Sequence, residues 1–327
     1  MTTKKLKWGL LSTAHINRAL IPVLKASTRN DLVAVASRSQ AAAEAYAREW
    51  GIQRAHASYE ALLEDPEIDL IYNSLPNHLH AEWSIKAMRA GKHVLCEKPL
   101  ALTLADVDSM RAEAQQSGKV LAEAFMYRHH PQTLAVQKLV EDGELGRLQL
   151  VRGAFTFPLS GSDDIRLKAD TGGGSIWDVG CYPISYARLL ARAEPEEVFG
   201  WQVLGDGGVD EAFAGQLRFR GGLYAQFDSG LRSPSRSFME VVGTEGTLNV
   251  PVPFKPGARA KIALTNGDVT RTLEIKGEEL YRGEVEDMAD AVLVGSQPRM
   301  SLADSRGNVA AILALIESAR TGKPVML

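Results

Sequence analysis

A short turn near the start of the chain is the first place where the sequence could do chemistry. Residues 6–11 predict a buried strand, and a helical pattern follows over about 14–26. Between them, Ser12, Ala14 and Asn17 occupy the glycine positions of a dinucleotide-binding turn, G-x-G-x-x-G. The replacements are small, so the turn could still present backbone N–H groups to a pyrophosphate at a helix N-terminus. The motif alone does not separate this cradle from an ordinary strand-to-helix turn. The residues predicted to contact the cofactor here are Ser12, Thr13, Ala14, His15 and Ile16.

The end of the second predicted strand, 32–36, bears on which dinucleotide is bound. An acidic residue at this point would hydrogen-bond the ribose 2′-OH of NAD, but the chain has Ser37 and Arg38. A guanidinium pairs with a 2′-phosphate through charge-assisted hydrogen bonds. The alternative is a solvated arginine at a helix start. We predict that Ser37 and Arg38 bind the cofactor and favour NADP, with NAD as the alternative.

Polar segments also follow the next two strong strands, predicted at 69–73 and 93–96. Ligands of open α/β sheets bind at the carboxyl ends of the strands, where both segments fall. The residues predicted to contribute to the cofactor site are Leu75, Pro76, Asn77, His80, Glu97 and Lys98. His78 and His80 have the spacing of two metal ligands, but no third ligand with suitable spacing is evident, and we expect no metal.

Two domains are predicted to position these residues. Strands alternate with helices up to about residue 124, which predicts an α/β, doubly wound parallel sheet of the Rossmann type. The rest predicts an α+β domain with an open, mostly antiparallel sheet. Its helices are expected at about 132–141, 175–190, 280–294 and 303–321, and its strands at 148–157, 197–204, 211–219, 223–229, 236–242, 246–250 and 261–265. The predicted division is 1–124 for dinucleotide binding and 125–327 for substrate binding and oligomerisation.

Composition excludes several classes of function. The formal net charge is −3, from 37 basic and 40 acidic residues, so no general basic field attracts nucleic acid or an anionic membrane. No apolar run approaches the ~18 residues of a membrane span. With only two cysteines, Cys96 and Cys181, a disulfide scaffold is excluded and a reducing cytoplasm is expected. The expected partner is therefore a small molecule.

Several motifs together resemble one known family. They are Glu97-Lys98-Pro99, Pro76-Asn77, the segments 123–128 and 172–184, and Val242-Gly243-Thr244-Glu245-Gly246. Taken along the chain, these motifs resemble the Gfo/Idh/MocA oxidoreductases over nearly its whole length. The branch most similar contains glucose–fructose oxidoreductase, NADP-dependent xylose dehydrogenase and dimeric dihydrodiol dehydrogenase. The resemblance implies hydride exchange between a nicotinamide and a carbon of a sugar, related polyol or cyclic alcohol. It also implies a homo-oligomer formed through the C-terminal sheet.

The resemblance further implies which residues are catalytic. Tyr182 is the candidate proton carrier, and Lys98 could favour its phenolate form and bond the substrate oxygen. Asp178 lies four residues before Tyr182, on the same face of one helix. Each residue alone has a structural alternative, as a packing tyrosine or one half of an ion pair. We predict that all three are catalytic and contact the substrate.

Further polar residues are predicted to contact the substrate, namely Tyr127, Arg128 and Arg166. His129 and His130, beside them, fit a domain interface equally well. Two other functions stay open. A trans-dihydrodiol or ketosugar reductase of the same family would differ in its substrate. A non-catalytic NADP-sensing protein would show no turnover on any substrate.

Overall fold

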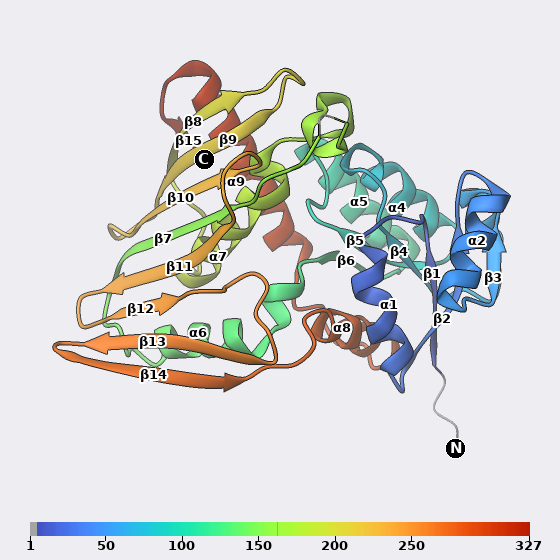
Figure 1. Ribbon diagram of the computed structural model, residues 1–327, viewed down its shortest axis with the longest axis horizontal. Coiled ribbons are helices and arrows are strands. Elements are labelled where there is room, and N and C mark those ends of the chain that lie inside the picture. The colour runs from blue at the N-terminus through green and yellow to red at the C-terminus, as the bar shows by residue number, and fades with distance from the viewer. Residues whose placement is uncertain (1–4, 162) are drawn as a thin grey trace. The chain divides into compact units, whose positions relative to one another are not determined.

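The computed structural model describes residues 5–161 and 163–327, and these form two compact units. The first unit extends to Met126 and includes Tyr281–Arg306, and the second comprises Tyr127–Leu280 and Gly307–Leu327. Each unit has its own sheet, as Figure 1 shows. The sequence-based division at 124 differs from these units in the segment Tyr281–Arg306, where helix α8 packs against α1 of the first unit.

The first unit is built on a parallel sheet with the strand order β3-β2-β1-β4-β5-β6. Its strands are β1 (Leu6–Leu10), β2 (Asn30–Ala36), β3 (Arg54–His56), β4 (Leu70–Asn73), β5 (His93–Glu97) and β6 (Leu121–Ala124). Its helices are α1 (Asn17–Ala26), α2 (Gln40–Trp50), α3 (Tyr59–Glu64), α4 (His80–Arg89), α5 (Leu104–Ser117) and α8 (Arg282–Leu293). The order reverses between β1 and β4, which is the switch point of a doubly wound fold. The predicted Rossmann-type architecture is confirmed.

Local sequence explains where these elements begin and end. Every residue of β4 is buried, as expected for a strand with helices on both faces. Helix α2 begins after Ser39, whose hydroxyl accepts a hydrogen bond from the Ala42 amide, and it ends at Gly51 with φ +60°. Helix α1 begins three residues later than predicted, because residues 14–16 form turns instead.

The second unit is built on a sheet with the strand order β14-β13-β12-β11-β7-β10-β9-β8-β15. Its strands are β7 (Leu148–Thr156), β8 (Glu197–Leu204), β9 (Asp210–Arg218), β10 (Tyr224–Gly230), β11 (Arg236–Gly243), β12 (Thr247–Val250), β13 (Arg259–Asn266), β14 (Val269–Lys276) and β15 (Val325–Met326). Neighbours pair antiparallel except β7 and β10. The predicted mostly antiparallel sheet is confirmed.

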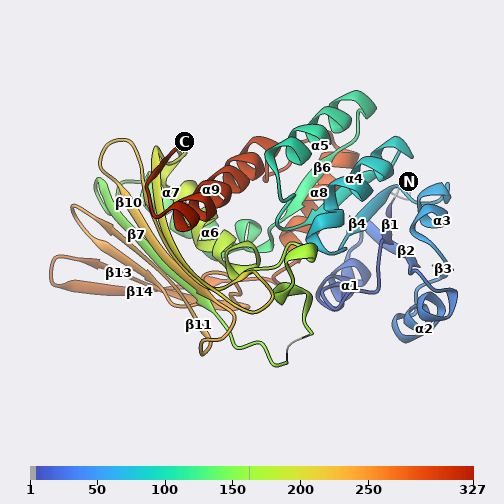
Figure 2. The same cartoon turned by 90° about the horizontal axis from the view of Figure 1, so that it is seen from above.

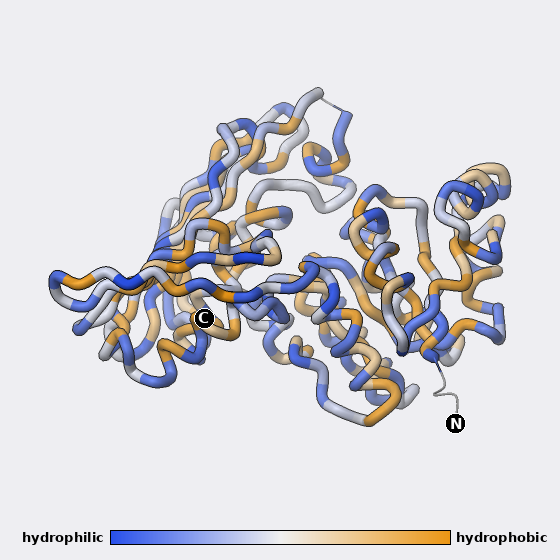
Figure 3. Tube along the Cα trace, turned by 60° about the horizontal axis from the view of Figure 1, so that its bottom comes forward, coloured by the Kyte–Doolittle hydropathy of each residue, from blue (hydrophilic) through white to orange (hydrophobic). Residues whose placement is uncertain are grey.

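Helices cover one face of this sheet and leave the other face open. Helices α6 (Pro131–Glu141), α7 (Cys181–Ala191) and the later part of α9 (Leu302–Thr321) lie on the same side (Figure 2). Hydrophobic and hydrophilic residues alternate along the long strands (Figure 3). On β8, Val198 and Gly200 are buried, and a Cβ at Gly200 would lie 3.0 Å from the Leu315 carbonyl oxygen. Trp201 and Val203 alternate with them and therefore lie on the open face.

The structure also contains elements that the sequence pattern did not predict. Strands β3, β14 and β15 were not predicted, because β3 and β15 are very short and β14 is mostly exposed, with an apolar alternation only at Leu273 and Ile275. The predicted helix 175–190 consists of a one-turn π-helix, Ile176–Gly180, followed by α7. Asp178 lies in this π-turn, and Tyr182 lies in the first turn of α7.

Candidate functional site

The turn after β1 is held by side chains at two of the three positions where glycine was expected. The Ser12 hydroxyl lies 2.9 Å from the Ser74 hydroxyl and accepts a hydrogen bond from the Ala14 amide at 3.1 Å. The buried Asn17 amide donates to the Ser12 carbonyl oxygen at 2.6 Å. No side chain caps the start of α1. The substitutions therefore give an ordered turn at the uncapped N-terminus of a helix, which fits a pyrophosphate.

The residues at the end of β2 are accessible. Ser37 is half-buried, and Arg38 is exposed next to Ser39, the N-cap residue of α2. The Arg38 charge also acts on Tyr59, where it opposes the effect of burial, which raises the pKa of that phenol. An exposed guanidinium at the carboxyl end of this strand fits the 2′-phosphate of NADP.

His80 connects the two loops that follow β4 and β5. Its Nδ1 lies 2.8 Å from the Pro99 carbonyl oxygen and its Nε2 lies 2.8 Å from the Leu75 carbonyl oxygen. The ring is fully buried, and burial lowers its pKa to about 4 despite both carbonyl contacts. Because both nitrogens face backbone carbonyls, we assign His80 to holding these loops together rather than to the predicted polar contact with a cofactor.

Two glutamates fix the segment that carries Lys98. The Glu97 carboxylate accepts hydrogen bonds from the buried Tyr72 hydroxyl and, at 3.2 Å, from the Lys98 amide. Burial, followed by the charge of Glu97, raises the pKa of Tyr72 well above its ordinary value. The Glu123 carboxylate accepts from the Leu100 amide at 2.9 Å. Lys98 itself is half-buried at the end of β5. Glu97, which the sequence predicted to contribute to the cofactor site, thus orders the stretch of backbone that carries the Lys98 side chain.

In the second unit, Tyr182 lies in the first turn of α7 and is only 4% exposed. Its ring packs among three aromatic rings, with centroid distances of 5.6 Å to Tyr127, 5.3 Å to Phe155 and 5.3 Å to Phe254. Such a cage fixes the direction of the phenol and leaves little freedom to its ring.

Asp178 lies in the π-turn that precedes α7, and Arg166 contacts it. The Arg166 Nε donates to Asp178 Oδ2 at 2.9 Å, and its Nη1 lies 3.2 Å from Asp164. Burial disfavours the Arg166 charge, but the two carboxylates raise its pKa above the ordinary value overall. Two residues that the sequence predicted to contact the substrate are therefore an ion pair in this unit.

Tyr127 and Arg128 both bind one serine of α7. The Tyr127 hydroxyl and Arg128 Nη1 each lie 2.9 Å from the Ser185 hydroxyl, one turn after Tyr182. Both side chains are buried. We therefore assign them to holding α7 in place, which differs from the substrate contacts predicted from sequence.

Comparison with known proteins identifies the family. Residues 6–125 match the model described as "Oxidoreductase family, NAD-binding Rossmann fold", and residues 133–249 match the GFO/IDH/MocA C-terminal domain. The chain belongs to the Gfo/Idh/MocA oxidoreductases. This confirms the predicted family, the predicted enzyme class and the nicotinamide dinucleotide as the class of cofactor.

Relatives of this oxidoreductase match over almost their full length. It is 39% identical to D-xylose 1-dehydrogenase (NADP(+)) 2 of Haloferax volcanii, over 98% of this chain and 99% of the relative. It is 35% identical to dTDP-3,4-didehydro-2,6-dideoxy-alpha-D-glucose 3-reductase of Streptomyces violaceoruber, over 95% and 93%. The aldose-aldose oxidoreductase of Caulobacter crescentus, crystallised with glycerol, has a TM-score of 0.92 and 27% identity, with 99% and 100% coverage.

Solved relatives also include a 3-ketoreductase of Actinomadura kijaniata in complex with NADP and TDP-benzene. This structure has a TM-score of 0.91 and 31% identity, and covers 96% of this chain and 98% of its own. These similarities give the fold and the class of reaction of this oxidoreductase.

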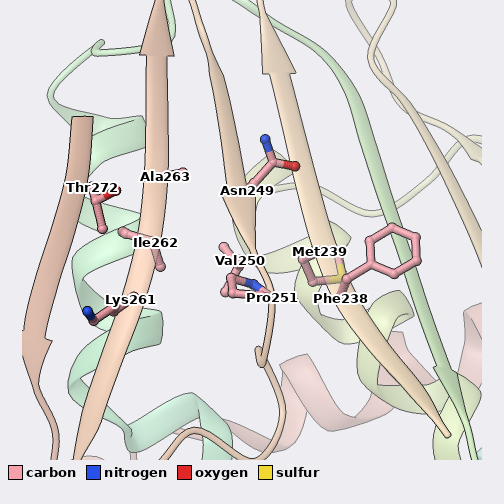
Figure 4. A pocket seen from close by; sticks show the side chains of 9 residues that line it. All are labelled: Phe238, Met239, Asn249, Val250, Pro251, Lys261, Ile262, Ala263 and Thr272. Atoms are coloured by element: carbon pink, nitrogen blue, oxygen red, sulfur yellow. The ribbon is translucent and has the colours of Figure 1, made fainter. Parts of the chain in front are cut away.

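Some features of this oxidoreductase have no counterpart in its sequence motifs. Ser175, Asp210 and Ser229 form a buried group beneath the π-turn, with no motif that would have singled them out. A pocket of about 320 Å³ also opens on the nine-stranded sheet (Figure 4). It is lined by Phe238, Met239, Asn249, Val250, Pro251, Lys261, Ile262, Ala263 and Thr272. None of the predicted site residues lines it.

The described part of the chain holds neither a cluster of metal ligands nor a helix able to span a membrane. Over residues 5–161 and 163–327, no three His, Cys, Asp or Glu side chains gather in a way that could hold a metal ion. Over the same ranges, no helix combines the length and the apolar character needed to cross a membrane.

Proposed function

We propose that this oxidoreductase exchanges a hydride between NADP(H) and the hydroxyl-bearing carbon of an aldose or a related sugar, with Tyr182 as the proton carrier. The observation that supports the substrate class most strongly is the 39% identity, over nearly the whole chain, to an NADP(+)-dependent D-xylose 1-dehydrogenase. The caged phenol of Tyr182 supplies the group that this reaction needs besides the cofactor.

The cofactor would be held by the residues at the carboxyl ends of the parallel strands. The turn of Ser12, Thr13, Ala14, His15 and Ile16 would bind the pyrophosphate, and Ser37 and Arg38 the 2′-phosphate. Leu75, Pro76, Asn77, Glu97 and Lys98 would flank the nicotinamide half. When bound, NADP accepts or donates the hydride. The protein's own residues must orient the sugar and move the hydroxyl proton.

Arg38 gives a direct test of the cofactor preference. An Arg38→Ala substitution should raise the KM for NADPH by about thirtyfold, because one charge-assisted, bidentate contact to the 2′-phosphate is lost. The KM for NADH should change by less than about twofold, since NADH lacks that phosphate. Steady-state kinetics with both cofactors measure this, and Arg48→Ala, an exposed arginine of the same helix region, is the control. Equal effects on both cofactors would remove Arg38 from this role.

Tyr182 takes the hydroxyl proton during oxidation and returns it during reduction. A free phenol has a pKa of ~10, and lowering it toward ~7 requires about 4 kcal/mol of stabilisation of the phenolate. We propose that the Lys98 ammonium provides this stabilisation and also hydrogen-bonds the reacting oxygen. Asp178, oriented by Arg166, would hold another sugar hydroxyl.

A solved relative supports the pairing of this lysine with this tyrosine. Structures of the Actinomadura 3-ketoreductase include one with a tyrosine replaced by phenylalanine, and others with a lysine replaced by alanine or glutamate. The two replaced positions are separated by the same number of residues as Lys98 and Tyr182. Both positions were therefore chosen for substitution in a protein that binds NADP.

A substrate panel distinguishes the sugar dehydrogenase from its alternatives. D-Xylose and other aldoses are tested with NADP⁺, a trans-dihydrodiol with NADP⁺, and a nucleotide-linked ketosugar with NADPH, all followed by nicotinamide absorbance. Highest kcat/KM with an aldose supports the proposal. Preference for the dihydrodiol or the ketosugar assigns the chain to those activities instead, and NADPH binding without turnover on any compound indicates a sensor.

We further propose a homo-oligomer formed through the open face of the nine-stranded sheet, and a cytoplasmic location. Trp201 and Val203 on β8 and Tyr224 on β10 are all more than half exposed, which is unusual for large apolar side chains. A second copy of the chain would cover them in a symmetric interface. The cytoplasmic location is supported by the low cysteine content, since the chain has only Cys96 and Cys181.

A charge on this face should prevent assembly. A Trp201→Glu variant should shift the oligomer to monomer at micromolar concentration, because an unpaired carboxylate would be buried in the interface. Light scattering coupled to size-exclusion chromatography measures the mass. Val294→Glu, on a more exposed valine of the first unit, is the control and should leave the mass unchanged. An oligomer that persists in Trp201→Glu would place the interface elsewhere.

A further inference from the structure

A buried carboxylate lies at the start of the helical segment that carries Asp178 and Tyr182. Asp210 is the first residue of β9 and is 6% exposed. Its Oδ2 accepts hydrogen bonds from the Ser175 hydroxyl at 2.5 Å and from the Ile176 amide at 2.9 Å. The Ser175 hydroxyl thereby uses its proton, so the Ser229 hydroxyl, 2.9 Å away, must donate to it. A strand of the sheet thus binds the first residues of the π-turn through one carboxylate.

The backbone around this carboxylate is shaped to accept it. Gly174 has φ +117°, which side chains rarely allow, and a Cβ there would lie 2.3 Å from Asp210 Oδ1. At the other end of the π-turn, a Cβ at Gly180 would lie 3.0 Å from the Ser229 hydroxyl. The glycines before and within this segment therefore let it approach β9 and β10 closely. Their presence is explained by packing on Asp210 and Ser229.

The contacts continue from Asp210 to the proposed site. The Asp178 amide donates to the Gly174 carbonyl oxygen at 3.0 Å, so Asp178 follows directly from the residues that Asp210 holds. The π-turn leads without interruption into α7, whose second residue is Tyr182. A negative charge at the N-terminal end of these turns also stabilises the helical amides.

We propose that Asp210 is a positioning residue for the reaction, whose carboxylate holds the Ser175–Ile176 turn and thereby fixes the directions of Asp178 and Tyr182. This inference rests on the proposed function of Tyr182. Asp210 itself touches neither the sugar nor the cofactor in this scheme.

The Asp210 carboxyl changes its charge between neutral and mildly acidic pH. Burial raises the pKa of its carboxyl to about 6, although hydrogen bonds from the Ser175 side chain and from the Ile176 amide oppose the rise. Nearby charged groups have partners of their own. Glu211 binds Arg232, Arg166 binds Asp164 and Asp178, and Lys168 binds Asp163. Asp210 is therefore charged at neutral pH and becomes neutral on mild acidification.

Protonation of Asp210 should affect stability and turnover in opposite directions. Because the folded-state pKa lies above the unfolded one, the folded protein binds more protons, and this group adds stability as pH falls from about 6 toward 4. The neutral carboxyl holds the turn more weakly, so turnover should fall over the same range. If acid unfolding caused the decrease in activity, stability and activity would instead fall together as the pH is lowered.

The test compares Asp210→Asn with the wild type in the reduction direction, with NADPH. In this direction Tyr182 acts as an acid and is protonated at low pH, so it contributes no loss of rate there. Near neutral pH, Asp210→Asn should lower kcat by about tenfold, with less than about a twofold change in the KM for NADPH. Near pH 5 the two enzymes should be nearly equal, because the wild-type carboxyl is then neutral. The variant's kcat should show no change near pH 6.

Two further variants complete the test: one is a control at another carboxylate, and the other weakens the Asp210 contact while keeping its charge. Asp287→Asn makes the same change at a half-buried carboxylate of α8 that accepts a backbone amide, and should leave the kcat profile unchanged. Ser175→Ala removes one of the hydrogen bonds but keeps the charge. It should lower kcat by about threefold and retain an acid limb, moved above pH 6 because the Ser175 hydrogen bond that lowers the pKa of Asp210 is lost, and it decides the question if Asp210→Asn does not fold.

The outcomes separate this inference from the proposed function. If Tyr182→Phe is inactive and Asp210→Asn follows the wild-type pH profile with unchanged kcat, the role of Asp210 is rejected and that of Tyr182 stands. If Ser175→Ala lacks the acid limb, the titrating group is not Asp210. If Tyr182→Phe keeps full turnover, the proposed function fails whatever Asp210 does.

Discussion

A Tyr182→Phe variant should lose about a thousandfold in kcat while binding NADPH as tightly as the wild type. The substitution removes one oxygen and keeps the ring, so the packing with Tyr127, Phe155 and Phe254 is retained. The group that transfers the hydroxyl proton is therefore lost while the ring packing stays. Steady-state rates with D-xylose and NADP⁺, together with NADPH binding followed by fluorescence, measure the two effects separately.

Tyr186→Phe is the matched control for this variant. Tyr186 lies one turn further along α7, its ring stacks on Tyr127, and its hydroxyl is buried without a hydrogen-bond partner in the described part of the chain. Removing this hydroxyl should leave kcat within about twofold of the wild type, because no proton transfer depends on it. A Tyr182→Phe variant as active as Tyr186→Phe would contradict the assignment of the proton carrier.

A Lys98→Met variant should lose about a hundredfold in kcat for oxidation at neutral pH. Methionine preserves most of the side-chain volume but removes the ammonium, so the phenolate of Tyr182 forms only at higher pH. The loss should therefore become smaller as the pH is raised. Rates of NADP⁺ reduction between neutral and alkaline pH record this partial recovery.

Lys86→Met controls for the loss of a lysine elsewhere in the first unit. Lys86 is exposed on α4, where it binds Glu82, and its loss should leave the pH profile unchanged. A Lys98→Met variant whose loss is the same at every pH would show that the ammonium does not act on the proton carrier.

The sequence predicts much of the fold because local signals and burial agree there. Ser39 and Thr103 cap the starts of two helices, Gly51 and Gly118 end them, and the buried strands of the parallel sheet are continuous apolar runs. The signals are absent where structure depends on tertiary pairing. Strand β14 pairs with β13 along its whole length, yet most of its side chains are exposed, so only Leu273 and Ile275 alternate with polar residues and the pattern is too short to predict the strand.

In the candidate site too, sequence could not predict the contacts that depend on tertiary structure. Sequence reasoning selected Asp178 and Arg166 separately, and the structure shows that they form an ion pair. It selected Tyr127 and His80 for ligand contacts because of their neighbours in sequence, whereas the structure buries both and uses their polar atoms to hold Ser185 and two loop carbonyls. Asp210 carried no signal, because its partner Ser175 is distant in the chain.

A double-mutant cycle tests most directly whether Lys98 and Tyr182 act as one unit. The kcat for D-xylose oxidation is measured for the wild type, Lys98→Met, Tyr182→Phe and the double variant. Since the ammonium is proposed to act mainly through the phenol and also to hydrogen-bond the reacting oxygen, the double variant should be slower than Tyr182→Phe by no more than about tenfold. Losses that multiply, giving a double variant about a hundredfold slower than Tyr182→Phe, would mean that the two residues work independently and would contradict the proposed mechanism.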